Sequence, residues 1–154
     1  VVDRIVAGRY AGEHDPFITT AFVPDDLSRT PVFVPWWYAE SYGQFKRGDY
    51  PGSIASFSNF VRAYPQSALA PSAQYWVGNA YYARKDYRAS IAAQRTLISV
   101  YPSSNKVPDA LLNIATSQFE MNDAAASRRT LEELIAKFPQ SDAAVKAKQR
   151  LAIR

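Results

Sequence analysis

Residues 64–76, "YPQSALAPSAQYW", begin with an aromatic residue and a proline, followed after one intervening residue by a serine. The same order returns as "YPSS" from Tyr101 and as "FPQS" from Phe138. Both steps, from Tyr64 to Tyr101 and from Tyr101 to Phe138, are 37 residues long. Self-similarity at one fixed period is typical of a solenoid, so this recurrence decides the fold before any local motif does.

Each period predicts two helices. Ile54, Phe57, Phe60 and Val61 recur at helical spacing, and apolar residues repeat this pattern one and two periods later. A proline at Pro65 and at its two equivalents ends each second helix, because proline lacks an amide donor and clashes with the preceding turn. A sharp reversal inside each pair is predicted at Gly48-Asp49, Lys85-Asp86 and Asn122-Asp123.

These paired helices resemble tetratricopeptide repeats that are longer than the usual ~34 residues. Gly78 and Tyr81 take the small and aromatic positions of the first helix in that repeat. Ser53, Ser90 and Ser127 take the small position of the second helix. The resemblance implies an all-α solenoid of three helical hairpins plus a C-terminal capping helix, preceded by an irregular N-terminal arm.

The expected division of the chain follows from this pattern. The arm covers residues 1–36 and the repeat domain covers 37–154, with repeats at about 37–67, 68–104 and 105–141 and a capping helix at 142–154. Two stretches of the repeat domain, "FKRGDYPGSIASFSNF" from Phe45 and "KVPDALLNIATSQFEMNDAA" from Lys106, are similar to the C-terminal domain of the CpoB (YbgF) family of the Tol-Pal system.

That resemblance implies a non-enzymatic periplasmic adaptor. The implied partners are TolA and a bifunctional penicillin-binding protein, and the implied role is to coordinate peptidoglycan synthesis with outer-membrane constriction in cell division. The alternative is a generic peptide-binding or assembly scaffold of the bacterial cell envelope, resembling the repeat lipoproteins that help insert outer-membrane proteins. The chain starts at Val1 without a secretory signal, which suits a processed product or an excised piece equally.

Charge is distributed unevenly along the 154 residues. Residues 1–36 carry three basic and five acidic residues, whereas residues 37–154 carry fifteen basic and nine acidic ones. The repeat domain should therefore favour acidic segments or C-terminal peptides as partners. Its bases are scattered singly through helices, so nucleic acid is not expected to bind. The sequence contains no run of about 18 apolar residues, so no membrane span is predicted. It contains no cysteine, which excludes disulfides and thiolate sites.

The arm follows neither the period nor the linker expected before such repeats. Its four prolines argue against a long helix, so extended segments with short strands are expected there. An acidic, apolar arm beside a basic groove could occupy that groove, its own or that of a neighbour, and so support self-association. The simpler alternative is that the arm covers the exposed end of the first repeat.

The sequence predicts no catalytic, cofactor or metal site. His14 is the only histidine, and it lies between two acids in the arm, without the regular elements that fix metal ligands. No Gly-x-Ser-x-Gly elbow, phosphate-binding glycine loop or nucleophile–base–orienter set is present. A solvated loop is the expected environment of His14, and a binding module is the expected class of protein.

The resemblance places the partner-binding groove on the first helix of each repeat. The groove candidates are Tyr38, Tyr42, Phe45, Tyr75, Asn79, Tyr82, Asn113, Thr116, Phe119, Lys146 and Arg150. Its aromatic members offer broad contact area at a low entropic cost.

Four of these candidates match a pattern by which some tetratricopeptide proteins hold a partner's C-terminal carboxylate. Asn79, Asn113, Lys146 and Arg150 match it, whereas Tyr75 replaces the first lysine. Amides and a planar guanidinium can hold an oxyanion through charge-assisted hydrogen bonds. The alternative is that Lys146 and Arg150 only solvate the last helix and favour its dipole.

Overall fold

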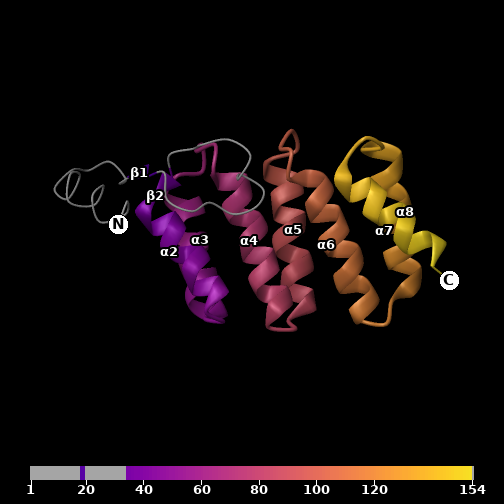
Figure 1. The fold of residues 1–154 in the computed structure, drawn as a ribbon, viewed down its shortest axis with the longest axis horizontal. Coiled ribbons are helices and arrows are strands. Elements are labelled where there is room, and N and C mark those ends of the chain that lie inside the picture. Colours follow the sequence, from indigo (N-terminus) through magenta and orange to yellow (C-terminus); the bar gives the residue numbers. More distant parts are fainter. Residues whose placement is uncertain (1–17, 20–33, 154) are drawn as a thin grey trace. The chain divides into compact units, whose positions relative to one another are not determined.

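The computed structural model describes residues 18–19 and 34–153, with side chains from Glu40 to Ile153. The predicted arm, including His14, otherwise lies outside the described residues. Within them, two-residue strands β1 (Ile18–Thr19) and β2 (Val34–Pro35) pair antiparallel, and helices follow (Figure 1). The helices are α2 (Trp36–Lys46), α3 (Tyr50–Ala63), α4 (Ala70–Ala83), α5 (Tyr87–Val100), α6 (Val107–Glu120), α7 (Ala124–Lys137) and α8 (Asp142–Ala152).

The turns within the three hairpins share one backbone conformation. Gly48, Lys85 and Asn122 all have positive φ, at 83°, 64° and 63°. The aspartate that follows each of them caps the next helix, as Asp86 does by accepting a hydrogen bond from the Ala89 amide at 3.2 Å. A residue in the left-handed backbone conformation reverses the chain sharply. The aspartate carboxylate then accepts a hydrogen bond from an amide at the start of the next helix that has no partner within that helix. The second helix of each pair therefore starts at a fixed residue.

The chain divides into two compact units, and the boundary falls inside α4, after Ala73. In the first unit α2 packs on α3, where Phe57 is fully buried and Phe60 nearly so. The Ser56 hydroxyl donates a hydrogen bond to Gln44 Oε1 at 2.8 Å and joins the two helices. This unit therefore has a small core of its own.

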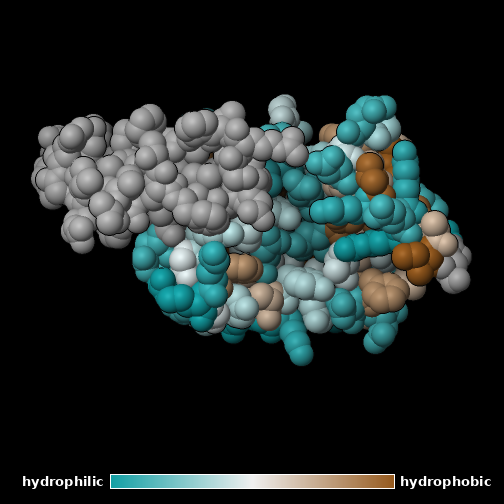
Figure 2. Space-filling view, viewed as in Figure 1, coloured by the Kyte–Doolittle hydropathy of each residue, from teal (hydrophilic) through white to brown (hydrophobic). Residues whose placement is uncertain are grey.

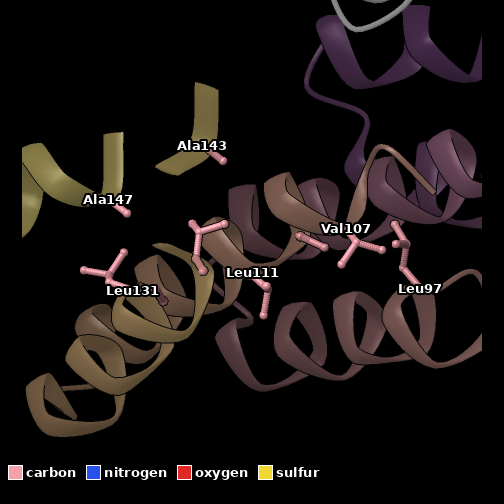
Figure 3. Close-up of a cluster of buried hydrophobic side chains, with 9 residues drawn as sticks. Leu97, Val107, Leu111, Leu131, Ala143 and Ala147 are labelled. Atoms are coloured by element: carbon pink, nitrogen blue, oxygen red, sulfur yellow. The ribbon is translucent and has the colours of Figure 1, made fainter. Parts of the chain in front are cut away.

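In the second unit α5 packs on α6, α6 on α7, and α7 on α8. Leu97 of α5, Leu111 of α6, Leu131 of α7 and Ala147 of α8 meet in one buried cluster, and Figure 3 shows their side chains pointing toward a shared interior. Leu97 and Leu134, one period apart, are both fully buried. Every period thus places the same core position between the same pair of helices, as the spacing predicted.

Gly78 of α4 and Gln94 of α5 are matched in size where these two helices pack together. Gln94 is fully buried and stands one period after Phe57 and one before Leu131. Its Nε2 donates to the Tyr75 carbonyl at 3.1 Å, while the Ser90 hydroxyl donates to the Gly78 carbonyl at 2.8 Å. A Cβ atom on Gly78 would lie only 2.1 Å from Gln94 Nε2. The missing side chain of Gly78 therefore makes room for the long side chain of Gln94.

Candidate functional site

The groove candidates of the second unit lie on α4, α6 and α8, the first helices of successive periods. Tyr42, which is buried, and Phe45, whose ring meets Tyr50 edge-on at 5.4 Å, belong to the first unit. The Tyr38 side chain lies outside the described part of the chain. We use the name inner face for six residues of the second unit: Asn79, Tyr82, Asn113, Thr116, Phe119 and Arg150.

Two amides of the inner face bind each other across α4 and α6. Asn113 Nδ2 donates to Asn79 Oδ1 at 2.5 Å, and both side chains are half-buried. Asn113 Oδ1 in turn lies 3.0 Å from Ser90 Oγ, whose single proton is shared between this oxygen and the Gly78 carbonyl. Because Asn113 is held from two sides, its orientation is fixed before any partner binds.

Arg150 of α8 makes the next link of the inner face. Its guanidinium donates a hydrogen bond to the Thr116 hydroxyl, which itself donates to the Leu112 carbonyl at 2.9 Å. Arg150 is exposed, and a guanidinium has five donors, so most of its hydrogen-bonding capacity faces solvent. An anionic group can therefore bind here without disrupting the fold.

Tyr82 of the inner face pairs with Glu120, a neighbouring residue of α6, with 3.5 Å between the hydroxyl and Oε1. Burial raises the pKa of the Tyr82 phenol, the nearby charges of Glu120 and Tyr87 raise it further, and Arg150 lowers it. The phenol is therefore held in its neutral, hydrogen-bonding form.

This raised pKa predicts a pH dependence of stability. The folded protein holds the Tyr82 proton more tightly than the unfolded chain, so the contribution is present below the ordinary pKa of 10.0 and is lost as pH rises through the raised value. The difference in free energy of unfolding between the unsubstituted protein and Tyr82→Phe should shrink as pH rises from about 8 to about 11. Urea unfolding at the two pH values measures it, and an unchanged difference would contradict the assignment.

Lys106 was missed by the sequence interpretation, although it lies next to Tyr75. Its side chain is buried, its Nζ lies 4.5 Å from the centre of the Tyr75 ring, and it pairs with Asp109 at 3.3 Å. Tyr75 packs against the core cluster of the second unit. The spacing of Lys106 and Asp109, one helical turn apart, was the available signal, but it does not show that the ammonium lies over an aromatic ring.

The four residues of the carboxylate pattern separate into two groups. Asn79 and Asn113 contact each other, whereas Lys146 and Arg150 are exposed on α8. Among the described residues, no hydrogen bond or ion pair joins these cations to the two amides. The use of these four residues as a carboxylate clamp therefore stays a prediction.

An open pocket of about 750 Å³ lies where the inner face meets α7. Thr116, Phe119 and Arg150 were predicted as groove residues and line it. The lining that the sequence did not predict is Glu120, Ala124, Ala125, Ser127, Arg128, Leu131, Leu151 and Ile153. Figure 2 shows apolar surface gathered among hydrophilic atoms at the C-terminal helices. Phe119, which lines the pocket, is 64% exposed.

Two kinds of site are not found in the described part of the chain. From residue 34 to 153 no group of three His, Asp or Glu side chains could hold a metal ion. Over the same residues no helix is both long and apolar enough to cross a bilayer.

Comparison with known protein families decides the family. Residues 36–153 match YfiO, described as an outer membrane lipoprotein. The chain belongs to this family. The match covers all the helices described above, so it places the YfiO-family chain among cell-envelope proteins with a tetratricopeptide-type fold. No curated protein matches the chain closely enough to add a relative.

Solved structures confirm the fold of this YfiO-family chain. The second tetratricopeptide domain of human RPAP3, in complex with the HSP70 peptide SGPTIEEVD, is 18% identical, with a TM-score of 0.59 over 77% of this chain and 93% of that one. The TPR2B domain of yeast Sti1, in a complex with pHsp70, is 19% identical, with a TM-score of 0.59 over 73% and 88%. The CopN–Scc3 complex matches at 15% identity and a TM-score of 0.63, over 100% and 99%. The predicted all-α repeat solenoid is therefore correct.

Proposed function

We propose that this YfiO-family chain is a non-enzymatic adaptor of the cell envelope that binds a peptide segment of a partner protein on its inner face. The observation that supports this most directly is the row of side-chain pairs along α4, α6 and α8. Asn79–Asn113, Thr116–Arg150 and Tyr82–Glu120 present amides, a guanidinium and a phenol on one face. Such groups recognise backbone and carboxylate oxygens of a bound peptide.

Charge and fold point to the same class of partner. The net positive charge of residues 37–154 favours an acidic segment. The RPAP3 domain was solved with the HSP70 peptide SGPTIEEVD, three of whose last four residues are acidic, and the Sti1 domain was solved in a complex with pHsp70. An acidic or C-terminal peptide is therefore the ligand class that we propose for this chain, on the periplasmic side of the envelope.

We consider two roles for the chain, which differ in the partner that it would bind. The resemblance to CpoB supports TolA, together with a bifunctional penicillin-binding protein, and with them a role in coordinating envelope constriction during division. The match to the YfiO outer membrane lipoproteins supports the second candidate, an assembly scaffold of the outer membrane. We propose the inner face as the binding surface in both cases, and titration with TolA and with a short C-terminal peptide distinguishes the two.

The test is calorimetric titration of the 154-residue chain with the soluble periplasmic part of TolA, and separately with the free-acid and amidated forms of the peptide SGPTIEEVD. Arg150→Ala and Asn79→Ala should weaken binding about tenfold, which corresponds to ~1.4 kcal/mol. Lys148→Ala, also an exposed cation of α8, is the matched control and should leave binding unchanged.

The outcomes separate the proposals. Saturable TolA binding that Arg150→Ala weakens supports the adaptor that resembles CpoB. Binding of the free-acid peptide alone, without TolA, supports the general scaffold and the carboxylate pattern. If neither ligand binds, or if Arg150→Ala and Lys148→Ala behave alike, the inner face is not the binding surface.

A further inference from the structure

The second helices of two successive hairpins, α5 and α7, both pack on α6 and leave a cleft between them (Figure 1). We call this space, of about 270 Å³, the outer cleft. Its walls include Arg95, Ile98 and Ser99 of α5 and Glu133 of α7, and its floor is Leu111 and Ile114 of α6. The two floor residues are only 6% and 3% exposed, and Ile98 is half-buried. The outer cleft therefore has an apolar base below a charged rim.

The outer cleft and the inner face lie on nearly opposite sides of α6. Leu111 of the cleft stands two residues before Asn113 of the inner face, and Ile114 stands two residues before Thr116. Each residue of an α-helix turns by about 100°, so side chains two residues apart point about 200° away from each other. A partner bound in the outer cleft therefore leaves the inner face accessible to a second partner.

The preceding hairpin has a polar residue where the outer cleft has its floor. Gln74 of α4 is the equivalent of Leu111, and its Nε2 donates a hydrogen bond to the Ala93 carbonyl of α5 at 2.9 Å. A leucine cannot form such a bridge. Thr130, the equivalent of Ala93, also lines the cleft, and its hydroxyl already donates to Gln118 Oε1 at 2.7 Å. The floor of the cleft therefore favours an apolar group from a partner.

The rim of the outer cleft offers one cation to a partner. Arg95 is exposed, and its guanidinium makes no hydrogen bond or ion pair with any described residue. Glu133, on the other wall, already pairs with Lys137, with 2.8 Å between Oε1 and Nζ. A guanidinium binds a carboxylate through two parallel hydrogen bonds, whereas a carboxylate that is already paired attracts an ammonium group less. The charges therefore favour an acidic side chain beside the apolar one.

The size of the outer cleft favours a protein segment over a small molecule. Pockets that enclose a small-molecule ligand usually measure about 300–1,000 Å³. The outer cleft, at about 270 Å³, is smaller than this and matches a single side chain. An apolar anchor in a pocket next to an arginine is typical of the centre of a protein interface.

We propose that the outer cleft is a second protein-binding site, where a partner inserts one apolar side chain between α5 and α7 and places an acidic side chain on Arg95. The role of this site rests on the proposed adaptor function, because an adaptor holds two partners at once and the inner face provides for only one. The chemistry of the site rests on the outer cleft alone. The two sites bind their partners simultaneously, on opposite sides of α6.

The test is a titration of the 15N-labelled 154-residue chain, followed by amide chemical shifts, with the end-capped peptide GLSEG. Its leucine and glutamate are two residues apart, so they face the same side of an extended segment. Saturable shifts of the Ile98, Ser99 and Thr130 amides are expected below about 10 mM peptide, a range that detects millimolar dissociation constants. GASEG should bind at least about tenfold more weakly, since it lacks most of the apolar anchor. GLSQG should bind about threefold more weakly, since an exposed ion pair contributes little.

Two pairs of protein variants locate the binding. Arg95→Gln should remove the preference for glutamate over glutamine, whereas Arg88→Gln, also an exposed cation of α5 but outside the cleft lining, should keep it. Ser99→Trp places a large side chain in the cleft and should abolish binding. Ser103→Trp makes the same change at an exposed position in the turn before α6, outside the cleft lining, and should leave binding unchanged.

Three results would overturn the inference: no shifts around the outer cleft, equal affinity for GLSEG and GASEG, or equal loss of binding in both tryptophan variants. Binding of anionic phospholipid vesicles that Arg95→Gln abolishes, without binding of the peptide, would overturn it as well and assign the cleft to lipid.

Titrations with TolA and SGPTIEEVD separate this inference from the adaptor proposal. Arg95→Gln should leave unchanged the affinity of the ligand that Arg150→Ala weakens, and saturating GLSEG should not displace that ligand. Displacement would show that there is one binding surface and not two. If TolA or SGPTIEEVD binds and GLSEG does not, only the outer cleft is wrong. If GLSEG alone binds, with the expected dependence on Arg95 and Ser99, the outer cleft is a binding site and the inner-face proposal fails.

Discussion

Leu134→Ala is expected to lower the free energy of unfolding by about 3 kcal/mol, because the side chain is fully buried between α7 and its neighbours and the surrounding helices cannot close the cavity completely. Leu134 belongs to the cluster that joins four helices, so its loss weakens several helix contacts at once. Urea unfolding followed by circular dichroism at 222 nm measures the change.

Val145→Ala is the control for this prediction. Val145 is 52% exposed on α8, and alanine has the higher helix propensity. The control should therefore change stability by less than about 0.5 kcal/mol. Similar unfolding midpoints for the two variants would show that the buried cluster does not dominate the stability of this unit.

Gly78→Ala is expected to destabilise the protein by about 2 kcal/mol, although alanine is the better helix former. The added Cβ would lie 2.1 Å from Gln94 Nε2 and 2.5 Å from its Cδ, so the buried amide would have to move away from the Tyr75 carbonyl. A buried amide without its partner costs about 1–3 kcal/mol. Thermal and urea unfolding both measure the loss.

Gly43→Ala makes the same substitution within α2 and should have the opposite sign. Only the Arg47 guanidinium comes close to the new Cβ, at 3.1 Å, and that side chain is exposed and can move. A gain of about 0.5–1 kcal/mol is expected from helix propensity alone. If both alanine variants are stabilised, the contact between Gly78 and Gln94 does not constrain the packing of α4 on α5.

The helices were predictable from the sequence because their signals are local and are repeated. Three prolines one period apart mark the ends of α3, α5 and α7, and the aspartate after each turn marks where these helices begin. Helical spacing also places Asn79, Thr116 and Arg150 on successive first helices. The assignment of the groove and the division at residue 37 stay predictions, since spacing alone does not show which partner binds.

The pairings within the site could not be predicted, since they depend on which rotamer tertiary packing selects. The sequence does not show that Asn113 binds Asn79, or that Lys106 lies over the Tyr75 ring. The pocket depends on how side chains of α6, α7 and α8 pack against one another, which the sequence pattern does not show. The repeat markers belong to the fold, so they could not decide between the CpoB and YfiO families.

The contact between Gly78 and Gln94 also limits how the hairpins can exchange partners. Chains built from similar repeats are prone to misassembly, because a second helix can dock on the first helix of the wrong unit. The positions equivalent to Gly78 are Ser41 and Ala115, and both carry a Cβ. Because a Cβ at this position would meet the buried Gln94 side chain, α5 is expected to form a hairpin with α4 more readily than with a first helix that carries serine or alanine there, which disfavours exchange of hairpin partners during folding.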